Sequence, residues 1–338
     1  MYFLNFKYSC IIDTPFSLFL YLLMCKDGDW NKTVFFIGDG IEETSIKHLK
    51  RTVYFPTDHC HYCTKKLLLR SKVRALFYRM IYISHTKLYA QDHLEASSQL
   101  IGRNKYVHIE DAPGFYSFNH PEAARIPRGL RSKLRRLILL GPMYGQTYGR
   151  NKYCTDRWVT EVCDLQSPIL QDRHCTLLNL KQLWNSASEE KKQYIYTVFG
   201  INEIVLQKLR KQHTIIFTQP FEEGGLKMED IVPILKPYIE KYKYDGGVVL
   251  KLHPRDKMEW NKAFSDVPVI TLRIPMQILN ILGVEYKRAI TFFSTSISAM
   301  SPETEIIWLG TNYPKLADVY PDQIKCPYVG KFKNIYYK

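Results

Sequence analysis

The chain has 338 residues, of which 46% are hydrophobic and 24% are charged, values that exclude wholesale disorder and are typical of globular proteins. This length is enough for two domains, each burying its own core. Lys and Arg number 47 against 33 Asp and Glu, a formal net charge of +14. The excess favours an anionic partner, such as a charged donor, anionic lipid or nucleic acid, and carries no information about the fold.

Basic residues concentrate in two stretches, residues 65–79 and 125–136. Such stretches are typical both of a solvated helix face and of a surface that docks on an anionic membrane or a phosphorylated glycolipid. Nucleic acid is not expected as a partner, because no recognisable binding module accompanies the charge. The apolar stretch Phe16–Cys25 lacks a small-residue cleavage site and is too short to span a bilayer, which needs about 20 apolar residues. We therefore expect a cytoplasmic protein, with peripheral attachment to a membrane left open.

Eight cysteines are spread along the chain without a disulfide framework, as in proteins of reducing compartments. Only Cys60-His61-Tyr62-Cys63, preceded by His59, has the spacing of metal ligands. A structural zinc site normally needs a second such pair, and none stands out. No metal is therefore expected, although the sequence does not decide what this segment binds.

Short β-rich runs alternate with helical patterns, the signature of βαβ units and parallel sheets. In the first half of the chain, strands are expected at Tyr8–Ile12, Val34–Ile37, Val53–Phe55, Ile81–Ser84 and Tyr106–Ile109. Helices are expected at Phe16–Met24, where Pro15 suits the first helical position, and at Lys65–Met80.

Residues from about 141 to 200 are less regular, and a second alternating series follows them. Helices are expected at Ser188–Val198, Glu203–Lys211, Glu229–Lys243, Met276–Leu282 and from Ser296, and strands at Thr214–Thr218, Val248–His253, Val267–Leu272, Ala289–Phe293 and Ile306–Leu309. The two series predict an α/β protein of two Rossmann-like domains, residues 1–205 and residues 206–338.

Three strand ends carry chemistry, and ligands of open α/β sheets bind beyond the carboxyl ends of strands. The first end is Glu110-Asp111, which the strand Tyr106–Ile109 delivers into a turn with Pro113 and Gly114. Because adjacent side chains of an extended segment point opposite ways, only one carboxylate faces a given site, where it would act as a general base. An Asx-type turn, in which Asp111 caps the following backbone, is the equally weighted alternative.

The second end is Lys251-Leu252-His253-Pro254-Arg255. Lys251 and His253 share a face by the two-residue alternation of a strand, and Pro254 stops the hydrogen-bond ladder. A histidine near two cations is placed to meet an anionic group and give it a proton. A purely structural role is the alternative. The position of His253 at the ligand-binding edge favours the functional interpretation.

The third end is Ser294-Thr295, where a buried strand leads into a helix. The first turn of a helix offers unpaired N–H groups and a favourable dipole, so it predicts a phosphate site. Ordinary N-capping by either hydroxyl is the alternative, and the two roles can coexist. Asp111 and His253 fall in different predicted domains, so only a closed cleft between the domains would bring them together.

The sequence resembles the bacterial sialyltransferases of the GT-B fold, especially glycosyltransferase family 52, which includes lipooligosaccharide sialyltransferases. The resemblance rests on three motifs, on their order along the chain and on their places at strand ends: Glu110-Asp111, His253-Pro254 and Ser294-Thr295. The early Asp13-Thr14-Pro15 turn is also similar to that family. The resemblance spans roughly residues 100–310. It implies a GT-B fold, in which two Rossmann-like domains with parallel sheets face an interdomain cleft.

The resemblance implies inverting transfer of sialic acid from CMP-sialic acid to a galactose-type hydroxyl of a lipooligosaccharide or capsular glycan, with neither metal nor other cofactor. It implies that Asp111 deprotonates the acceptor hydroxyl and that His253 is the acid or hydrogen-bond donor to the departing CMP phosphate. The first domain would bind the glycan or glycolipid acceptor and the second the nucleotide sugar; a homodimer is left open. Residues expected to bind the nucleotide are Lys251, Pro254, Arg255, Gln277, Ser294, Thr295 and Gln219.

Two departures from the family pattern keep other functions open. Ala112 stands where a glycine is expected, and Gln277 stands where relatives tend to carry a Glu that holds the ribose. A glucosyl- or galactosyltransferase of surface glycan synthesis that uses a UDP-sugar is therefore the second enzyme considered. Such transfers often recruit a divalent cation, but the DxD-like Asp27-Gly28-Asp29 is interpreted as a turn. The alternative of another class is a basic, non-catalytic module that binds nucleic acid or membrane.

Overall fold

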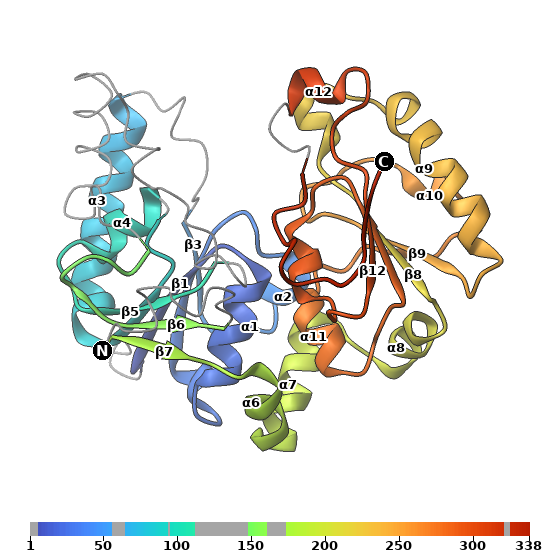
Figure 1. Ribbon diagram of the computed structural model, residues 1–338. Coiled ribbons are helices and arrows are strands. Elements are labelled where there is room, and N and C mark those ends of the chain that lie inside the picture. The colour runs from blue at the N-terminus through green and yellow to red at the C-terminus, as the bar shows by residue number, and fades with distance from the viewer. Residues whose placement is uncertain (1–5, 56–64, 94, 112–147, 161–173, 321–324) are drawn as a thin grey trace. The chain divides into compact units, whose positions relative to one another are not determined.

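The chain divides into two compact units, Met1–Val198 and Phe199–Lys338, and the sequence-based boundary lies at residue 205. The computed structural model describes residues 6–55, 65–93, 95–111, 148–160, 174–320 and 325–338 (Figure 1). Each unit is built around its own parallel sheet. Among the described residues, no helix combines the length and the apolar character that crossing a membrane requires.

The described part of the first unit contains a seven-stranded sheet of order β3-β2-β1-β4-β5-β6-β7, in which every neighbouring pair is parallel. Its strands are β1 (Tyr8–Ile12), β2 (Thr33–Ile37), β3 (Thr52–Tyr54), β4 (Lys87–Ala90), β5 (Tyr106–Ile109), β6 (Cys154–Val159) and β7 (Cys175–Leu177). The helical elements are α1 (Pro15–Met24), η2 (Asp29–Lys32), α2 (Glu43–Ile46), α3 (Lys65–Ile81), η4 (Ile83–His85), α4 (Glu95–Ile101), α6 (Leu180–Ser186) and α7 (Glu189–Phe199).

Helices cover both faces of this sheet. Phe36 of β2 belongs to a buried cluster with Ala75 of α3 and Leu100 of α4. The ring of Phe35, the preceding residue, instead meets Tyr21 of α1 edge to face, with 5.6 Å between centroids. Because successive side chains of a strand point to opposite faces, α1 lies on one face and α3 and α4 on the other (Figure 1).

One predicted strand of the first unit is wrong. Ile81–Ser84 is not a strand, because α3 continues to Ile81 and is followed by the 3₁₀ turn η4. Tyr82 and Ile83 are apolar because they pack into the core beneath the sheet, where they are 4% and 1% exposed. The strand at this point is β4, six residues further on. The error matters for function, because with the strand misplaced the polar residues after β4 are not recognised as lying at a strand end.

The described part of the second unit contains a six-stranded sheet of order β10-β9-β8-β11-β12-β13, again parallel throughout. Its strands are β8 (Thr214–Phe217), β9 (Val248–Lys251), β10 (Val269–Ile270), β11 (Arg288–Thr291), β12 (Glu305–Trp308) and β13 (Ile335–Tyr337). The helical elements are α8 (Glu203–Arg210), η9 (Phe221–Gly224), α9 (Met228–Lys243), α10 (Trp260–Ala263), α11 (Met276–Ile281), η10 (Thr295–Ala299) and α12 (Leu316–Val319).

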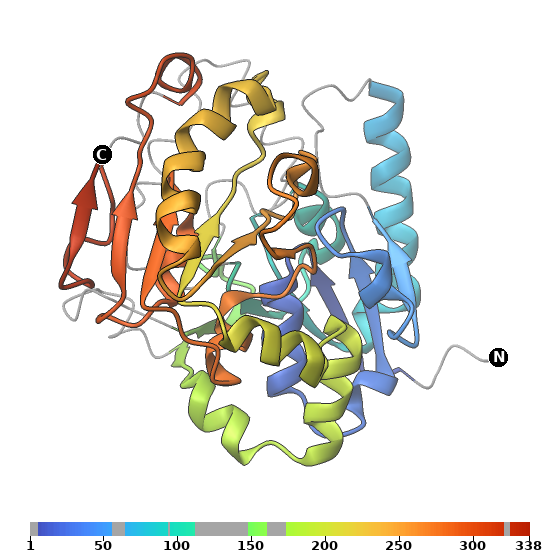
Figure 2. The same cartoon turned by 90° about the vertical axis from the view of Figure 1, so that its right-hand side faces the viewer.

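The helix α9 forms much of the second core. Its buried residues Ile231, Leu235 and Ile239 recur every four positions, which places them on one face of the helix. They pack with Leu250 of β9 and Ile290 of β11, and Figure 2 shows α9 running alongside this sheet. The strands β8, β9 and β11 therefore all pack against residues of the same core cluster as α9.

Both sheets have the strand order of a Rossmann fold, 3-2-1-4-5-6, counted from the first strand of each unit. The α/β prediction with two Rossmann-like parallel sheets is confirmed. In this order the chain changes direction across the sheet between β1 and β4 in the first unit, and between β8 and β11 in the second. Ligands of such folds bind at these switch points, beyond the carboxyl ends of the strands.

Candidate functional site

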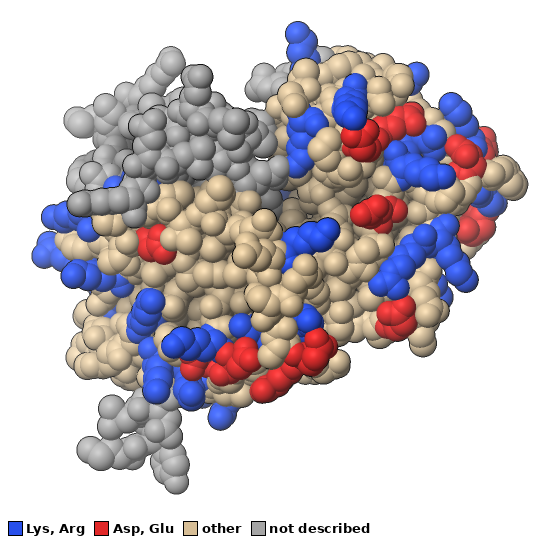
Figure 3. All heavy atoms as spheres, turned by 60° about the horizontal axis from the view of Figure 1, so that its bottom comes forward, with Lys and Arg blue, Asp and Glu red and all other residues tan. Residues whose placement is uncertain are grey.

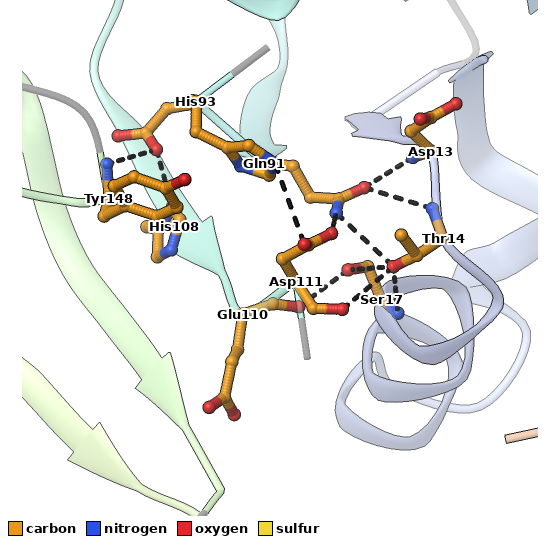
Figure 4. A network of polar contacts seen from close by, with 10 residues as sticks. Asp13, Thr14, Ser17, Gln91, His93, His108, Glu110, Asp111 and Tyr148 are labelled. Atoms are coloured by element: carbon orange, nitrogen blue, oxygen red, sulfur yellow. Dashed lines mark hydrogen bonds and ion pairs between the residues drawn. The ribbon is translucent and has the colours of Figure 1, made fainter. Parts of the chain in front are cut away.

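At the carboxyl edge of the first sheet, residues that follow three strands meet (Figure 4). Asp13 and Thr14 follow β1, Gln91 to His93 follow β4, and Glu110 and Asp111 follow β5. β1 and β4 are the neighbours that flank the switch point, and β5 lies beside β4. The fold therefore gathers these polar residues at the place where a Rossmann sheet binds its ligand.

Gln91 links the three strand ends. It is fully buried, and its Oε1 accepts hydrogen bonds from the backbone N–H groups of Asp13 and Thr14. Its Nε2 donates to Oδ1 of Asp111. Since an amide oxygen is needed opposite the two N–H groups, the amide nitrogen must face the carboxylate. Gln91 thereby fixes the position of one carboxylate oxygen of Asp111.

The two adjacent carboxylates point in opposite directions, in keeping with the alternation expected for an extended segment. Glu110 is fully buried, and its Oε2 accepts hydrogen bonds from the N–H of Thr160 at 2.8 Å and from the Oγ1 of Thr160 at 2.7 Å. The side chain of Asp111 is 28% exposed, and its Oδ2 lies 3.8 Å from Nε2 of His93. Asp111 is thus the carboxylate available for chemistry.

The start of α1 holds the backbone of this acidic pair. The Oγ of Ser17 donates to the carbonyl of Glu110 at 2.6 Å, and the Oγ1 of Thr14 donates to the carbonyl of Asp111 at 3.1 Å. On the far side of the β1 turn, the N–H of Gly40 donates to Asp13 at 3.1 Å. A Cβ at Gly40 would lie 1.8 Å from the carbonyl oxygen of Asp13, so only glycine allows this approach.

A buried carboxylate, Asp92, lies directly behind the site in contact with a buried histidine, His108. Asp92 accepts hydrogen bonds from the Tyr106 hydroxyl at 2.6 Å and from the N–H groups of Tyr148 and Gly149 at 2.7 and 2.8 Å. His108 Nδ1 lies 3.1 Å from its Oδ1. Burial raises the pKa of Asp92, but His108 and these donors outweigh it and lower the pKa to about 2. Asp92 is therefore ionised at neutral pH.

Asp92 in turn positions His93. Tyr148 has a left-handed backbone with φ of 61°, which is unfavourable for a residue with a side chain and is typical of functional sites. Its N–H bond to Asp92 stabilises this conformation. The Tyr148 ring stacks on the ring of His93, with 4.9 Å between centroids and an angle of 9° between the planes. His93 is thus held flat beside Asp111 (Figure 4).

At the carboxyl edge of the second sheet, His253 is held by the end of the neighbouring strand β8 and by the turn that follows it. Its backbone N–H donates to Oγ1 of Thr218, which follows β8, at 3.0 Å. Its Nδ1 accepts from the N–H of Arg255 at 3.2 Å, so the neutral ring carries its proton on Nε2. Burial, and then Arg255, Lys251 and Arg273, lower the pKa of His253 to about 4. The histidine is therefore neutral at pH 7 before an anion arrives.

The other residues expected around the nucleotide lie at this same edge. Lys251, the last residue of β9, is 7% exposed, and Gln219 follows the adjacent β8 and is 5% exposed. Pro254 lies in the turn after His253. Arg255 is exposed and forms an ion pair with Glu223 at 2.9 Å. Gln277 is the second residue of α11, after β10, and is half-buried.

The Ser294-Thr295 end differs from the expected helix. The segment that follows is a 3₁₀ helix of five residues, η10, rather than an α-helix starting at Ser296. Ser294 caps it, because its Oγ accepts from the N–H of Ser296 at 3.2 Å, and its own N–H donates to Thr291 Oγ1 at 2.8 Å. Thr295 is exposed. The capping role is therefore present, and the dipole available for a phosphate is that of one turn only.

Several sequence-based expectations fall outside the described residues. They are the Cys60–Cys63 segment, the basic stretch 125–136 and Ala112. Within the described ranges, no three His, Cys, Asp or Glu side chains are grouped as a metal site requires. The DxD-like segment forms a turn, as expected, in which Gly28 has φ of 73° and Asp27 pairs with Lys191 at 3.3 Å.

Comparisons with known proteins find a family model and a relative that each match most of the chain. The model of glycosyltransferase family 52 matches residues 66–307. An uncharacterized protein of Haemophilus influenzae is 28% identical over 339 residues, covering 98% of this chain and all of that protein.

Two solved structures share the fold. A 2,6-sialyltransferase of Photobacterium sp., solved with CMP and lactose, has a TM-score of 0.55 at 10% identity, covering 98% of this chain and 78% of that one. The GT-B domain of the Photobacterium damselae sialyltransferase has a TM-score of 0.53 at 12% identity, covering 98% of this chain and all of that domain. The fold of the chain is therefore GT-B.

Proposed function

Because the chain belongs to glycosyltransferase family 52, we propose that it transfers sialic acid from CMP-sialic acid to a galactose-type hydroxyl of a lipooligosaccharide or capsular glycan. The observation that carries this proposal is the environment of His253, a neutral imidazole whose proton is on Nε2 and which lies among Lys251, Arg255 and Arg273. A donor that leaves as a single phosphate needs a proton or hydrogen bond and cationic surroundings, which this cluster supplies.

In the proposed reaction, Asp111 acts as the general base. Its carboxylate takes the proton of the acceptor hydroxyl, and the oxygen attacks the anomeric carbon of sialic acid from the face opposite CMP. Gln91 orients Oδ1 through its N–H, and the 28% exposure of the Asp111 side chain leaves it accessible to a sugar hydroxyl. One base and one displacement give inversion at the anomeric carbon.

His253 acts on the leaving group. The bond between the anomeric carbon and the phosphate oxygen breaks, and Nε2–H donates to that oxygen as negative charge develops there. Binding of the anionic phosphate favours the charged imidazolium and raises the pKa of His253 from about 4. The ring can then serve as an acid as well as a hydrogen-bond donor.

The remaining residues at the second edge bind the donor in this proposal. Lys251 and Arg255 lie along the nucleotide phosphate, and the hydroxyls of Ser294 and Thr295 bind its oxygens, with Gln277 toward the ribose and Gln219 and Pro254 lining the same edge. That Asp111 and His253 converge on one substrate stays a prediction. A structure of the protein with CMP and an acceptor sugar tests it directly.

A donor panel tests the proposed function. The protein is incubated with CMP-sialic acid and lactose-type acceptors in the presence of EDTA, and CMP release and product mass are followed. We expect sialylated product in EDTA, and we expect Asp111→Asn and His253→Ala each to lower turnover about a hundredfold or more. Near-normal turnover in either variant removes that residue from the mechanism.

Gln277 favours a second candidate, a UDP-hexose-dependent glucosyl- or galactosyltransferase. Its amide offers a donor and an acceptor where a carboxylate would offer two acceptors, which changes how a ribose is held. In the same panel, this candidate predicts UDP release from UDP-glucose or UDP-galactose and no product from CMP-sialic acid. A non-catalytic basic module predicts strongly salt-dependent binding and no turnover with any donor.

A further inference from the structure

The helix α3 (Lys65–Ile81) presents apolar side chains to solvent. Val73, Leu76, Phe77 and Met80 are 60%, 51%, 57% and 64% exposed. Their spacing of three, four and seven residues places them on one face of the helix. We call these four residues the α3 stripe.

The opposite face of α3 already has a partner. Ala75 is fully buried, and Tyr78 and Ile81 pack against the same hydrophobic cluster of the first unit. The helix is therefore held by the core through one face, on the side of the sheet opposite α1 (Figure 1). The α3 stripe contributes nothing to that core, so its apolar character calls for another explanation.

Positive charge flanks the α3 stripe on both sides. Lys72 and Arg74 lie one residue before and one residue after Val73, which sets them about 100° to either side of it around the helix. The guanidinium of Arg74 donates to the Tyr54 carbonyl at 3.1 Å and lies over the Phe55 ring, so it is fixed at the edge of the stripe. Residues 65–81 contain no Asp or Glu.

This combination differs from the charge distribution on the face of the protein that Figure 3 shows. On the face shown in Figure 3, acidic side chains lie among the basic ones. In α3, apolar residues lie between cations with no acidic residue, which is the pattern of a helix that lies in the headgroup region of an anionic bilayer.

We propose that the α3 stripe docks the protein on an anionic lipid surface, with Phe77 and Met80 inserted among the lipids and with Lys72 and Arg74 on the headgroups. A second copy of the chain is a poorer occupant, because pairing two α3 stripes would bring the basic residues of both helices together. The proposal does not depend on which sugar the protein transfers.

Vesicle co-sedimentation tests the proposal. The probes are vesicles of phosphatidylethanolamine containing phosphatidylglycerol, and vesicles of phosphatidylcholine alone. We expect binding to the anionic vesicles that weakens with salt, and we expect the double variant Phe77→Ser with Met80→Ser to lower it about tenfold or more. Ile204→Ser is the matched control, since Ile204 is 69% exposed on α8 of the other unit.

Three outcomes overturn the proposal. They are no preference of the parent protein for anionic vesicles, equal binding by the double variant, and an oligomer in sedimentation equilibrium that the double variant dissociates without any vesicle binding. Turnover with soluble lactose is measured alongside and is expected to be equal in all three proteins, which also shows that the variants fold. Loss of vesicle binding with intact turnover supports the proposal, and absence of turnover in all proteins affects only the proposed function.

Discussion

Gln91 donates a hydrogen bond from Nε2 to Oδ1 of Asp111, while its oxygen accepts from the backbone of the β1 turn. One buried side chain therefore connects the ends of β1, β4 and β5. The proposed base does not rely on its own short, partly exposed side chain for its position. Its orientation depends on an amide that the core holds rigidly, and this dependence is open to test.

Replacing Gln91 by Glu keeps an oxygen for the N–H groups of Asp13 and Thr14 but removes the N–H that faces Asp111. A negative charge then stands beside the proposed base and favours its protonated form. We expect kcat to fall about tenfold to a hundredfold, and the acidic limb of the pH–rate profile to move to higher pH. Full pH–rate profiles with CMP-sialic acid and lactose measure both effects.

Gln193→Glu makes the same chemical change at an exposed position of α7 in the same unit. We expect its profile to match that of the parent protein. An acidic limb that stays in place in Gln91→Glu would show that Gln91 supports the fold but does not act on the base.

Replacing His93 by Phe preserves a flat ring against Tyr148 but removes the nitrogen that lies 3.8 Å from Oδ2 of Asp111. If that nitrogen helps to hold the carboxylate or the acceptor hydroxyl, kcat falls about tenfold while the KM for the donor stays the same. Steady-state kinetics separate the two constants. Unchanged kcat would mean that the stacked ring alone is what the site uses.

His253 is expected to titrate at about pH 4 in the free protein, because burial and nearby cations disfavour its charged form. Lys251→Met removes one of these cations, so the pKa rises. Adding CMP to the parent protein places an anion among the cations, so the pKa of His253 rises toward neutrality. NMR titration of the imidazole signals, assigned by comparison with His253→Ala, measures all three values. A pKa that CMP leaves unchanged would contradict a contact between this ring and the phosphate.

Asp92→Asn removes a buried carboxylate charge and its contact with His108, which is 1% exposed. We expect the free energy of unfolding of the first unit to fall by about 3 kcal/mol. The folded pKa of Asp92, about 2, lies below its ordinary 3.8. Its contribution is therefore complete above pH 4 and is lost between about pH 4 and pH 2.

Hydrogen exchange of the β4 and β5 amides measures this loss within the first unit. Glu190→Gln neutralises an exposed carboxylate of the same unit and is expected to leave exchange unchanged. Equal protection in the parent protein and in Asp92→Asn would contradict the stabilising role of the pair.

The alternation of strands and helices was predictable from the sequence because buried parallel strands are short apolar runs bounded by polar residues. Tyr8–Ile12 and Tyr106–Ile109 coincide with β1 and β5. The polar residues after β5 and β9 were also apparent, since Asp111 and His253 follow apolar runs directly. Their roles, and their meeting at one substrate, stay predictions.

The residues missed in the sequence were missed for a physical reason. Apolar pattern does not distinguish a strand from a turn that packs under a sheet, and Ile81–Ser84 is such a turn. Placing the strand there left Gln91-Asp92-His93 without a strand before it. This polar triplet in fact directly follows the apolar residues of β4. A histidine and two polar residues at a strand end were the available signal.

The stretch between Asp111 and Tyr148 starts and finishes at the same histidine, since one of these residues lies beside His93 and the other stacks on it. Both anchors are secured from behind, by Thr14 and Asp92 respectively. His93 therefore links the end of β5 to Tyr148, two parts of the chain that are otherwise held by different partners. A ligand that displaces this one ring would disturb the surroundings of Asp111 and Tyr148 at the same time.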